Sequence, residues 1–247
     1  MPDAATTKVI GHLREANHAF GIALAGPVSD PGPPGQLVAR LGMFGFRQVE
    51  AIITLAEASE SLHLQVSQLV RSLLEAWFRA AWVVAPDDEE AKLRRTIGLV
   101  KSGLVQYRAK IAYNDKFLGP SDPTYLAVLG EREAETAQME EAHGIEMPPT
   151  VQTGMEELGR PDRYMIYRWE SDAVHVSTAG LGQLADQSLE GVTVLGVAGT
   201  TDQWVARMVA TWDTACDLYE IVTRQLGVKM ERWEEIRKKA QDDLLPL

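Results

Sequence analysis

The sequence predicts an all-α fold, arranged as a single-domain bundle of five or more long helices. Apolar residues recur at three- and four-residue spacing through long segments, which is typical of amphipathic helices. Strand-like alternation is nearly absent. The chain of 247 residues is 45% hydrophobic and 24% charged, which is the composition of an ordinary globular protein with one core.

The apolar periodicity also places each helix along the chain, to within a few residues at each boundary. The predicted helices span 4–25, 35–58, 61–85, 88–116, 123–143, 161–186, 201–226 and 229–243. The segment Val192-Thr193-Val194-Leu195 is the best strand candidate, because β-branched residues favour strands. We expect a short β-hairpin near 189–197, packed against a domain that spans 1–247.

The breaks between these helices have local causes. Prolines and glycines crowd the segment 27–35, which predicts a loop because proline lacks an amide donor and restricts the residue before it. The acidic run Asp87 to Glu90 suits a helix start, where the helix dipole favours negative charge. Gly119 to Pro123 predicts a turn. The segment 144–160 has little periodicity, so we expect a crossover or a lid.

Composition excludes several classes of function. A net charge of −11 argues against non-specific nucleic-acid binding, which depends on Lys and Arg neutralising phosphates. The single cysteine, Cys216, rules out an intramolecular disulfide and fits a reducing, cytoplasmic location. We expect neither secretion nor membrane insertion, because no cationic stretch leads into an apolar run near residue 1 and no window approaches 18 uncharged apolar residues. It also lacks the phosphate-loop, dinucleotide-binding, zinc-peptidase and nucleophile-elbow motifs, and nothing indicates a cofactor.

Two ionisable residues interrupt the most apolar predicted helix, 61–85. Arg71 and Glu75 lie one turn apart on the face that carries Phe78 and Trp82. Because a buried charge is costly unless it is paired, each residue is expected to accompany the other. The pair is either a structural ion pair or part of a ligand site.

The predicted helix 161–186 carries a polar stripe. Tyr164, Arg168, Ser171, His175 and Thr178 fall on one face, with apolar neighbours on both sides. We expect this stripe to line an interior seam, where Arg168 and Ser171 would orient the His175 imidazole or hold an anion. The alternative is a buried polar network that sets helix register.

Two blocks of sequence resemble a family of bacterial helical proteins that is known only as a domain of unknown function. The blocks are Leu69 to Ala76, with the pattern R-S-L-x-E, and Tyr167 to His175, with the pattern Y-x-x-x-S-x-x-x-H. The resemblance covers about residues 40–225 and implies no established activity.

A second resemblance is to HEPN proteins, which are helical bundles that often dimerise and in many cases act as metal-independent ribonucleases. Their signature is an arginine followed after four to six residues by a histidine, and Arg168 and His175 fit it. The resemblance implies that the histidine acts on the ribose 2′-hydroxyl while the arginine steadies the scissile phosphate. Trp169 stands where these enzymes usually have Asn, Asp or His.

These observations leave two leading functions open. In the first, the protein binds a small ligand or a protein partner through the polar seam, with Arg71, Glu75, Tyr164 and Tyr167 as binding residues. In the second, it is a HEPN-like ribonuclease or nucleotide-binding effector of a toxin or phage-defence system, a homodimer with RNA as partner and His175, Arg168 and Ser171 as catalytic residues. A metal site assembled from Glu50, Glu75 and His175 is a weaker alternative, and we expect no metal.

Overall fold

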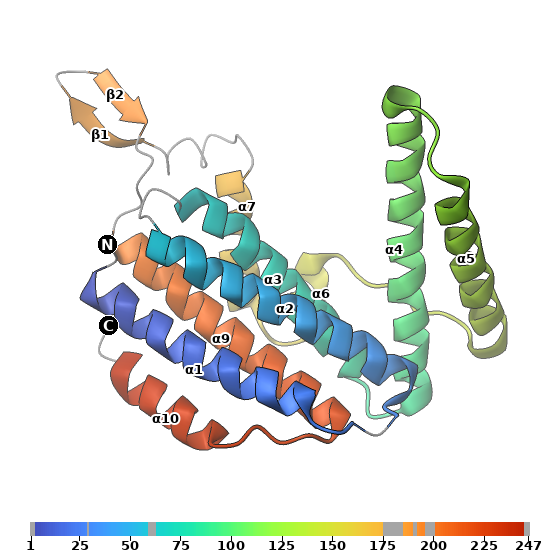
Figure 1. Cartoon of the computed structure of the whole chain (residues 1–247), viewed down its shortest axis with the longest axis horizontal. Helices are drawn as coiled ribbons and strands as arrows, with labels where there is room; N and C mark the ends of the chain where they lie inside the picture. Colours follow the sequence, from blue (N-terminus) through green and yellow to red (C-terminus); the bar gives the residue numbers. More distant parts are fainter. Residues whose placement is uncertain are drawn as a thin grey trace.

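The computed structural model describes residues 3–28, 30–58, 63–174, 185–189, 192–195 and 201–244. The fold is all-α, as predicted, with one short antiparallel hairpin among the described residues (Figure 1). The helices are α1 (Ala4–Ala25), α2 (Gly32–Ala58), α3 (His63–Val84), α4 (Glu89–Leu118), α5 (Pro123–His143), α6 (Val151–Glu157), α7 (Pro161–Val174), α9 (Thr201–Leu226) and α10 (Trp233–Leu244).

Helix starts follow the chemistry of the residues before them. Asp88 caps α4, and its carboxylate accepts hydrogen bonds from the amides of Glu90 and Ala91. Asp122 caps α5 in the same way, ahead of Pro123 in the first turn. The loop predicted for 27–35 is too long, because α2 begins at Gly32 and contains the prolines that follow it. Proline is tolerated there since amides of the first turn have no helical acceptor.

The helix predicted over 161–186 is also too long. Helix α7 is described as far as Val174, and Ala185 already belongs to strand β1 (Ala185–Leu189), which pairs with β2 (Val192–Leu195). The hairpin therefore begins earlier than the predicted span of 189–197, with Leu189 opposite Val192. Backbone pairing with a β-branched partner strand outweighs the helix propensity of residues 185 and 186.

The core lies among α1, α2, α3 and α9, which run alongside one another in Figure 1. Helix α9 packs against the other three. Phe20 of α1 stacks on Tyr219 of α9 with ring centroids 3.9 Å apart. Helices α2 and α9 approach so closely that a Cβ at Gly45 would lie 2.3 Å from Leu218 Cδ2. Glycine at position 45 therefore leaves the space that the Leu218 side chain fills.

The first and last described helices, α1 and α10, lie side by side (Figure 1). Helix α10 packs along α1, and Lys8 Nζ lies 3.0 Å from an oxygen of Asp243. His12 Nε2 lies 3.0 Å from the other oxygen of the same carboxylate. Among the described residues, no helix is both long and apolar enough to cross a bilayer.

Helices α4 and α5 form an antiparallel hairpin that stands beside the bundle (Figure 1). The segment between α5 and α6 crosses the base of α4, where the Glu146 amide donates to the Arg94 carbonyl at 3.2 Å. Arg95 Nε donates to the Glu146 carboxylate at 2.8 Å. The crossing point on α4 is Gly98, where a Cβ would lie 1.9 Å from the Glu146 carbonyl oxygen. Helix α6 then packs on α3 and α7.

Cys216 lies in the core on α9, and burial raises the pKa of its thiol well above the ordinary value. A thiol that is both buried and protonated reacts slowly, since the thiolate is the nucleophile. We expect a chromogenic disulfide reagent to leave the native protein unmodified at mildly alkaline pH. The same reagent should modify one thiol per chain when the protein is unfolded in urea. Rapid modification of the native protein would contradict this burial.

Candidate functional site

Helix α7 is held against α3 and α9 by three polar side chains on one face, Arg163, Tyr167 and Glu170. They recur at four- and three-residue spacing, which places them one above another on a helix. Tyr167 reaches α3, whereas Arg163 and Glu170 reach α9. We call these three residues the α7 ladder.

The middle rung joins α7 to the ion pair predicted on α3. Arg71 Nη2 donates to the Tyr167 hydroxyl at 3.1 Å, and that hydroxyl donates to Glu75 Oε1 at 3.2 Å. Arg71 Nε lies 3.4 Å from the same Glu75 oxygen. Arg79 Nη2 completes the cluster at 3.2 Å from Glu75 Oε2. The Arg71 and Glu75 side chains are 22% and 25% exposed, so this cluster is half-buried.

Arg163, the first residue of the α7 ladder, is fully buried, whereas its carboxylate partners are partly exposed. Arg163 has no exposed side-chain surface, and its Nη2 lies 2.6 Å from Asp213 and 2.7 Å from Asp217 of α9. Its guanidinium lies 4.0 Å from the centroid of the Trp77 ring, a cation–π contact. Arg160, just before α7, binds the same two carboxylates at 3.0 and 2.9 Å. Asp162 adds a third carboxylate to this charge cluster, 3.0 Å from Arg160.

The last rung is an ion pair that is almost wholly removed from solvent. Arg207 Nε of α9 donates to both carboxylate oxygens of Glu170 at 3.0 Å. Both side chains are 1% exposed. The Trp169 ring lies 5.3 Å from the Arg207 guanidinium, which adds a second stabilising contact to the charge. A pair this buried is held by its mutual attraction, because either charge alone is costly.

The polar stripe predicted on α7 does not line a dry seam. Arg168 is exposed, and Tyr164 and Ser171 are partly exposed. The buried face is the α7 ladder, offset from the predicted stripe by one residue, which is about 100° around the helix. Tyr164 packs beside Tyr167 with ring centroids 6.3 Å apart. His175 and Thr178 lie outside the described residues, so their part in a site stays a prediction.

A groove lies between α7 and α9, beside the ladder side chains that connect these two helices. Its volume is about 750 Å³. The ion pair of Glu170 and Arg207 lies in its wall, and Ala5 of α1 contributes from the N-terminal end of the chain. The apolar part of the lining comes mainly from six residues, Ile166, Trp169, Val205, Val209, Ala210 and Leu244. The groove is therefore apolar, with a small number of fixed polar groups.

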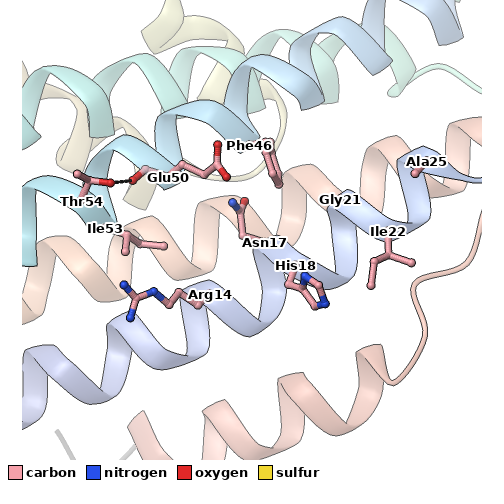
Figure 2. Close-up of a pocket in the computed structure, with 10 residues that line it drawn as sticks. All are labelled: Arg14, Asn17, His18, Gly21, Ile22, Ala25, Phe46, Glu50, Ile53 and Thr54. Carbon is pink, nitrogen blue, oxygen red and sulfur yellow. Dashed lines mark hydrogen bonds between the residues drawn. The ribbon is translucent and has the colours of Figure 1, made fainter.

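Figure 2 shows a second pocket, of about 490 Å³, between α1 and α2. Its polar groups come from Arg14, His18 and Glu50, all of which are exposed. Asn17 is the buried member, and its amide oxygen accepts a hydrogen bond from Tyr219. Since most of this polar lining already faces water, the pocket removes little of a ligand from solvent. The α7–α9 groove is the better candidate site.

Sequence reasoning missed the α9 side of this site. Arg207, Asp213 and Asp217 lie on an amphipathic helix at six- and four-residue spacing, and no local pattern distinguishes them from solvent-exposed charges. The usable signal was Arg163 with Glu170, two opposite charges seven residues apart on α7. They lie on the same helix face as Tyr167, which is one of the predicted binding residues.

Burial raises the pKa of the Tyr167 hydroxyl above its usual value. The nearby Glu75 carboxylate raises this pKa further, whereas Arg71 lowers it. The folded state therefore keeps this proton to a higher pH than the unfolded chain does. We expect stability to hold below the pKa of an unfolded tyrosine, about 10, and to fall as pH rises through the folded pKa. Urea unfolding at a series of alkaline pH values measures this effect.

Tyr167→Phe is the matched variant for that measurement. It removes the titrating hydroxyl and two hydrogen bonds, so it lowers stability by about 1 kcal/mol at neutral pH. The gap between wild type and variant should narrow at high pH. Tyr219, whose pKa is also raised by burial, is present in both proteins and cancels in the comparison. A gap independent of pH would contradict the assignment.

Among the residues that the structure describes, no group of three or more His, Cys, Asp or Glu side chains is placed to hold a metal ion. Comparison of the chain with protein-family models, curated proteins and solved structures gave no match.

Proposed function

We propose that this protein is a binding module that takes a small, largely apolar, uncharged molecule into the groove between α7 and α9. The observation that carries the proposal is the groove itself. It has a volume of about 750 Å³ and a mainly apolar lining, beside the buried pair of Glu170 and Arg207. Pockets for small molecules are typically of this size and character, with a few fixed polar groups that orient the ligand.

The charge balance around the groove supports an uncharged ligand. The three cations Arg160, Arg163 and Arg207 are each paired with carboxylates. Asp213, the other acidic residue of the lining, is held by Arg160 and Arg163. A charged ligand would be desolvated without a counter-ion, which is unfavourable. A hydroxyl or amide group on the ligand can instead hydrogen-bond to a side chain of the lining.

Rigid walls also support binding in a preformed site. The α7 ladder attaches α7 to α3 and α9 at three successive levels, and Arg71, Glu75 and Tyr167 serve in the proposal to hold the α7 wall in place. Preorganisation of this kind lowers the entropic cost of binding. Arg71 and Glu75, the predicted binding residues on α3, would then affect the ligand only through the position of α7.

The direct experiment is a titration with the neutral fluorescent probe N-phenylnaphthylamine, in parallel with its anionic relative anilinonaphthalene sulfonate. We expect saturable fluorescence enhancement and a raised melting temperature with the neutral probe, and weaker binding of the anion. Thermal-shift screening of uncharged aromatic and alicyclic compounds would then narrow the natural ligand class.

Groove-filling variants tie the binding to this location. Ala210 lies in the lining and is only partly buried, so Ala210→Phe places a ring in the groove with little strain on the core. We expect this variant to lose probe binding. Ala109→Phe, at an exposed position of α4, is the matched control and should bind as wild type. Equal binding by wild type and both variants would refute the proposed site.

The ribonuclease alternative remains a prediction from the resemblance to HEPN proteins. Arg168 is exposed on α7, so a phosphate can reach it, while its proposed partner His175 lies outside the described residues. If the alternative holds, purified protein cleaves RNA without added metal, and His175→Ala and Arg168→Ala each abolish cleavage while the melting temperature is unchanged. Intact RNA after incubation with the wild-type protein would exclude it.

A further inference from the structure

The α4–α5 hairpin exposes an unusual concentration of large apolar side chains. Eight of the fourteen exposed large hydrophobic residues in the described part of the chain lie on these two helices. Near the tip, Tyr113, Phe117 and Leu118 are 65%, 61% and 82% exposed. A concentration of exposed apolar side chains usually marks a surface that binds another molecule.

The hairpin cannot bury this surface within itself. In its outer half, Ile111 and Leu129 are the buried apolar residues. The other buried positions of α4 lie near its base, at residues 96–98. Two helices in contact have one shared seam, whereas stable helical bundles enclose a core among three or four. The exposed rings therefore require further helices to cover them.

The charges on the hairpin are divided between its two helices. The outer part of α4 carries four basic residues and one acidic residue, whereas α5 carries five glutamates and one arginine. Some of these are already paired within the hairpin, as Arg108 is with Glu133 at 2.6 Å. Exposed Lys110 on α4, and Glu131 and Glu141 on α5, have no ion-pair partner within the described chain.

We propose that this hairpin is the dimer interface of the protein, with α4 of one copy lying against α5 of a second copy in a four-helix arrangement. A two-fold axis places basic α4 opposite acidic α5 twice, so the same surface is complementary to itself. The opposite pairing, α4 against α4, brings like charges together. A second copy thus covers the exposed apolar side chains and supplies partners for the unpaired charges.

The available area is sufficient. The stretch 101–118 is about 27 Å long and a pair of helices is about 20 Å across. One face of the hairpin therefore offers on the order of 500 Å², and two copies bury on the order of 1,000 Å², which is at the lower bound for a specific interface. The interface leaves the α7–α9 groove in each copy untouched, so ligand binding and dimerisation are separable.

Sedimentation velocity over a concentration series tests the proposal. We expect a reversible dimer for the wild type, and a dissociation constant raised by about 100-fold in Phe117→Asp, because a charge is then buried among apolar side chains. Phe117 is exposed in the monomer, so the variant should fold normally. Met165→Asp replaces an equally exposed residue on α7, 69% exposed, and should dimerise as wild type.

A charge-reversal pair identifies the helices in contact. Lys110→Glu with Lys116→Glu replaces two basic charges of α4 by acidic ones, and Glu131→Lys with Glu141→Lys replaces two acidic charges of α5 by basic ones. Each double variant alone should dimerise weakly, and an equimolar mixture should form a heterodimer, since both α4–α5 contacts then regain opposite charges. A monomeric wild type, a dimer that survives Phe117→Asp, or a mixture that fails to associate would each overturn the proposal.

Discussion

Replacing Arg207 by methionine is expected to lower the free energy of unfolding by about 3–5 kcal/mol, because it leaves the Glu170 carboxylate buried without its partner. Arg207 Nε now donates to both oxygens of that carboxylate, and both side chains are 1% exposed. Methionine keeps much of the side-chain length and apolar contact, so the loss reports chiefly on charge. Urea unfolding followed by circular dichroism measures it.

Two further variants decide whether the charge is the cause. The double variant Glu170→Leu with Arg207→Met removes both charges and should recover most of the lost stability, since apolar replacements of a buried pair are often neutral or better. Arg232→Met breaks an ion pair to Glu235 that is largely exposed and should leave the urea midpoint unchanged. If the single and double variants are equally unstable, lost packing explains the effect.

Substitution of Gly98 by alanine is expected to destabilise the protein by about 1–3 kcal/mol, because the new methyl group enters space held by another backbone segment. A Cβ there would lie 1.9 Å from the Glu146 carbonyl oxygen and 2.7 Å from its carbonyl carbon. The segment cannot rotate away as a side chain could. It must shift, and the Glu146 hydrogen bond to Arg94 and the Arg95 ion pair are then weakened.

Gly103→Ala is the matched control on the same helix. A Cβ at Gly103 meets nothing within 4 Å, and alanine in an exposed helix interior is favoured over glycine by about 0.5–1 kcal/mol. The two Gly→Ala changes on α4 should therefore move the urea midpoint in opposite directions. Hydrogen exchange at the Glu146 amide should accelerate in Gly98→Ala alone. Shifts of the same sign in both variants would contradict the close crossing.

One part of the candidate site could be predicted from the sequence. The pairing of Arg71 with Glu75 follows from two opposite charges one turn apart, and the structure contains that ion pair. The choice of face on α7 was wrong, because several polar residues occupy neighbouring positions. An offset of one residue turns the helix by about 100°, so Tyr164, Arg168 and Ser171 were placed on the buried face, whereas Arg163 and Glu170 were not selected.

The partners on α9 required the fold. Arg207 lies 37 residues from Glu170 along the chain, and many polar residues of other helices were equally acceptable partners on sequence grounds. Helix periodicity reports which residues share a face, but it carries no information on which face of another helix lies opposite. The α4–α5 hairpin has the same limit, since its apolar residues were as compatible with the core as with an exposed surface.

The sequence by itself determined the all-α class, the approximate positions of most of the long helices and the acidic start of α4, because these depend on interactions between residues a few positions apart. Tertiary structure alone decided which charged side chains are buried, where α7 and α9 leave a groove and which helices remain uncovered. The physical reason is that burial depends on contacts between residues distant in sequence. Local patterns constrain such contacts only through the faces they offer.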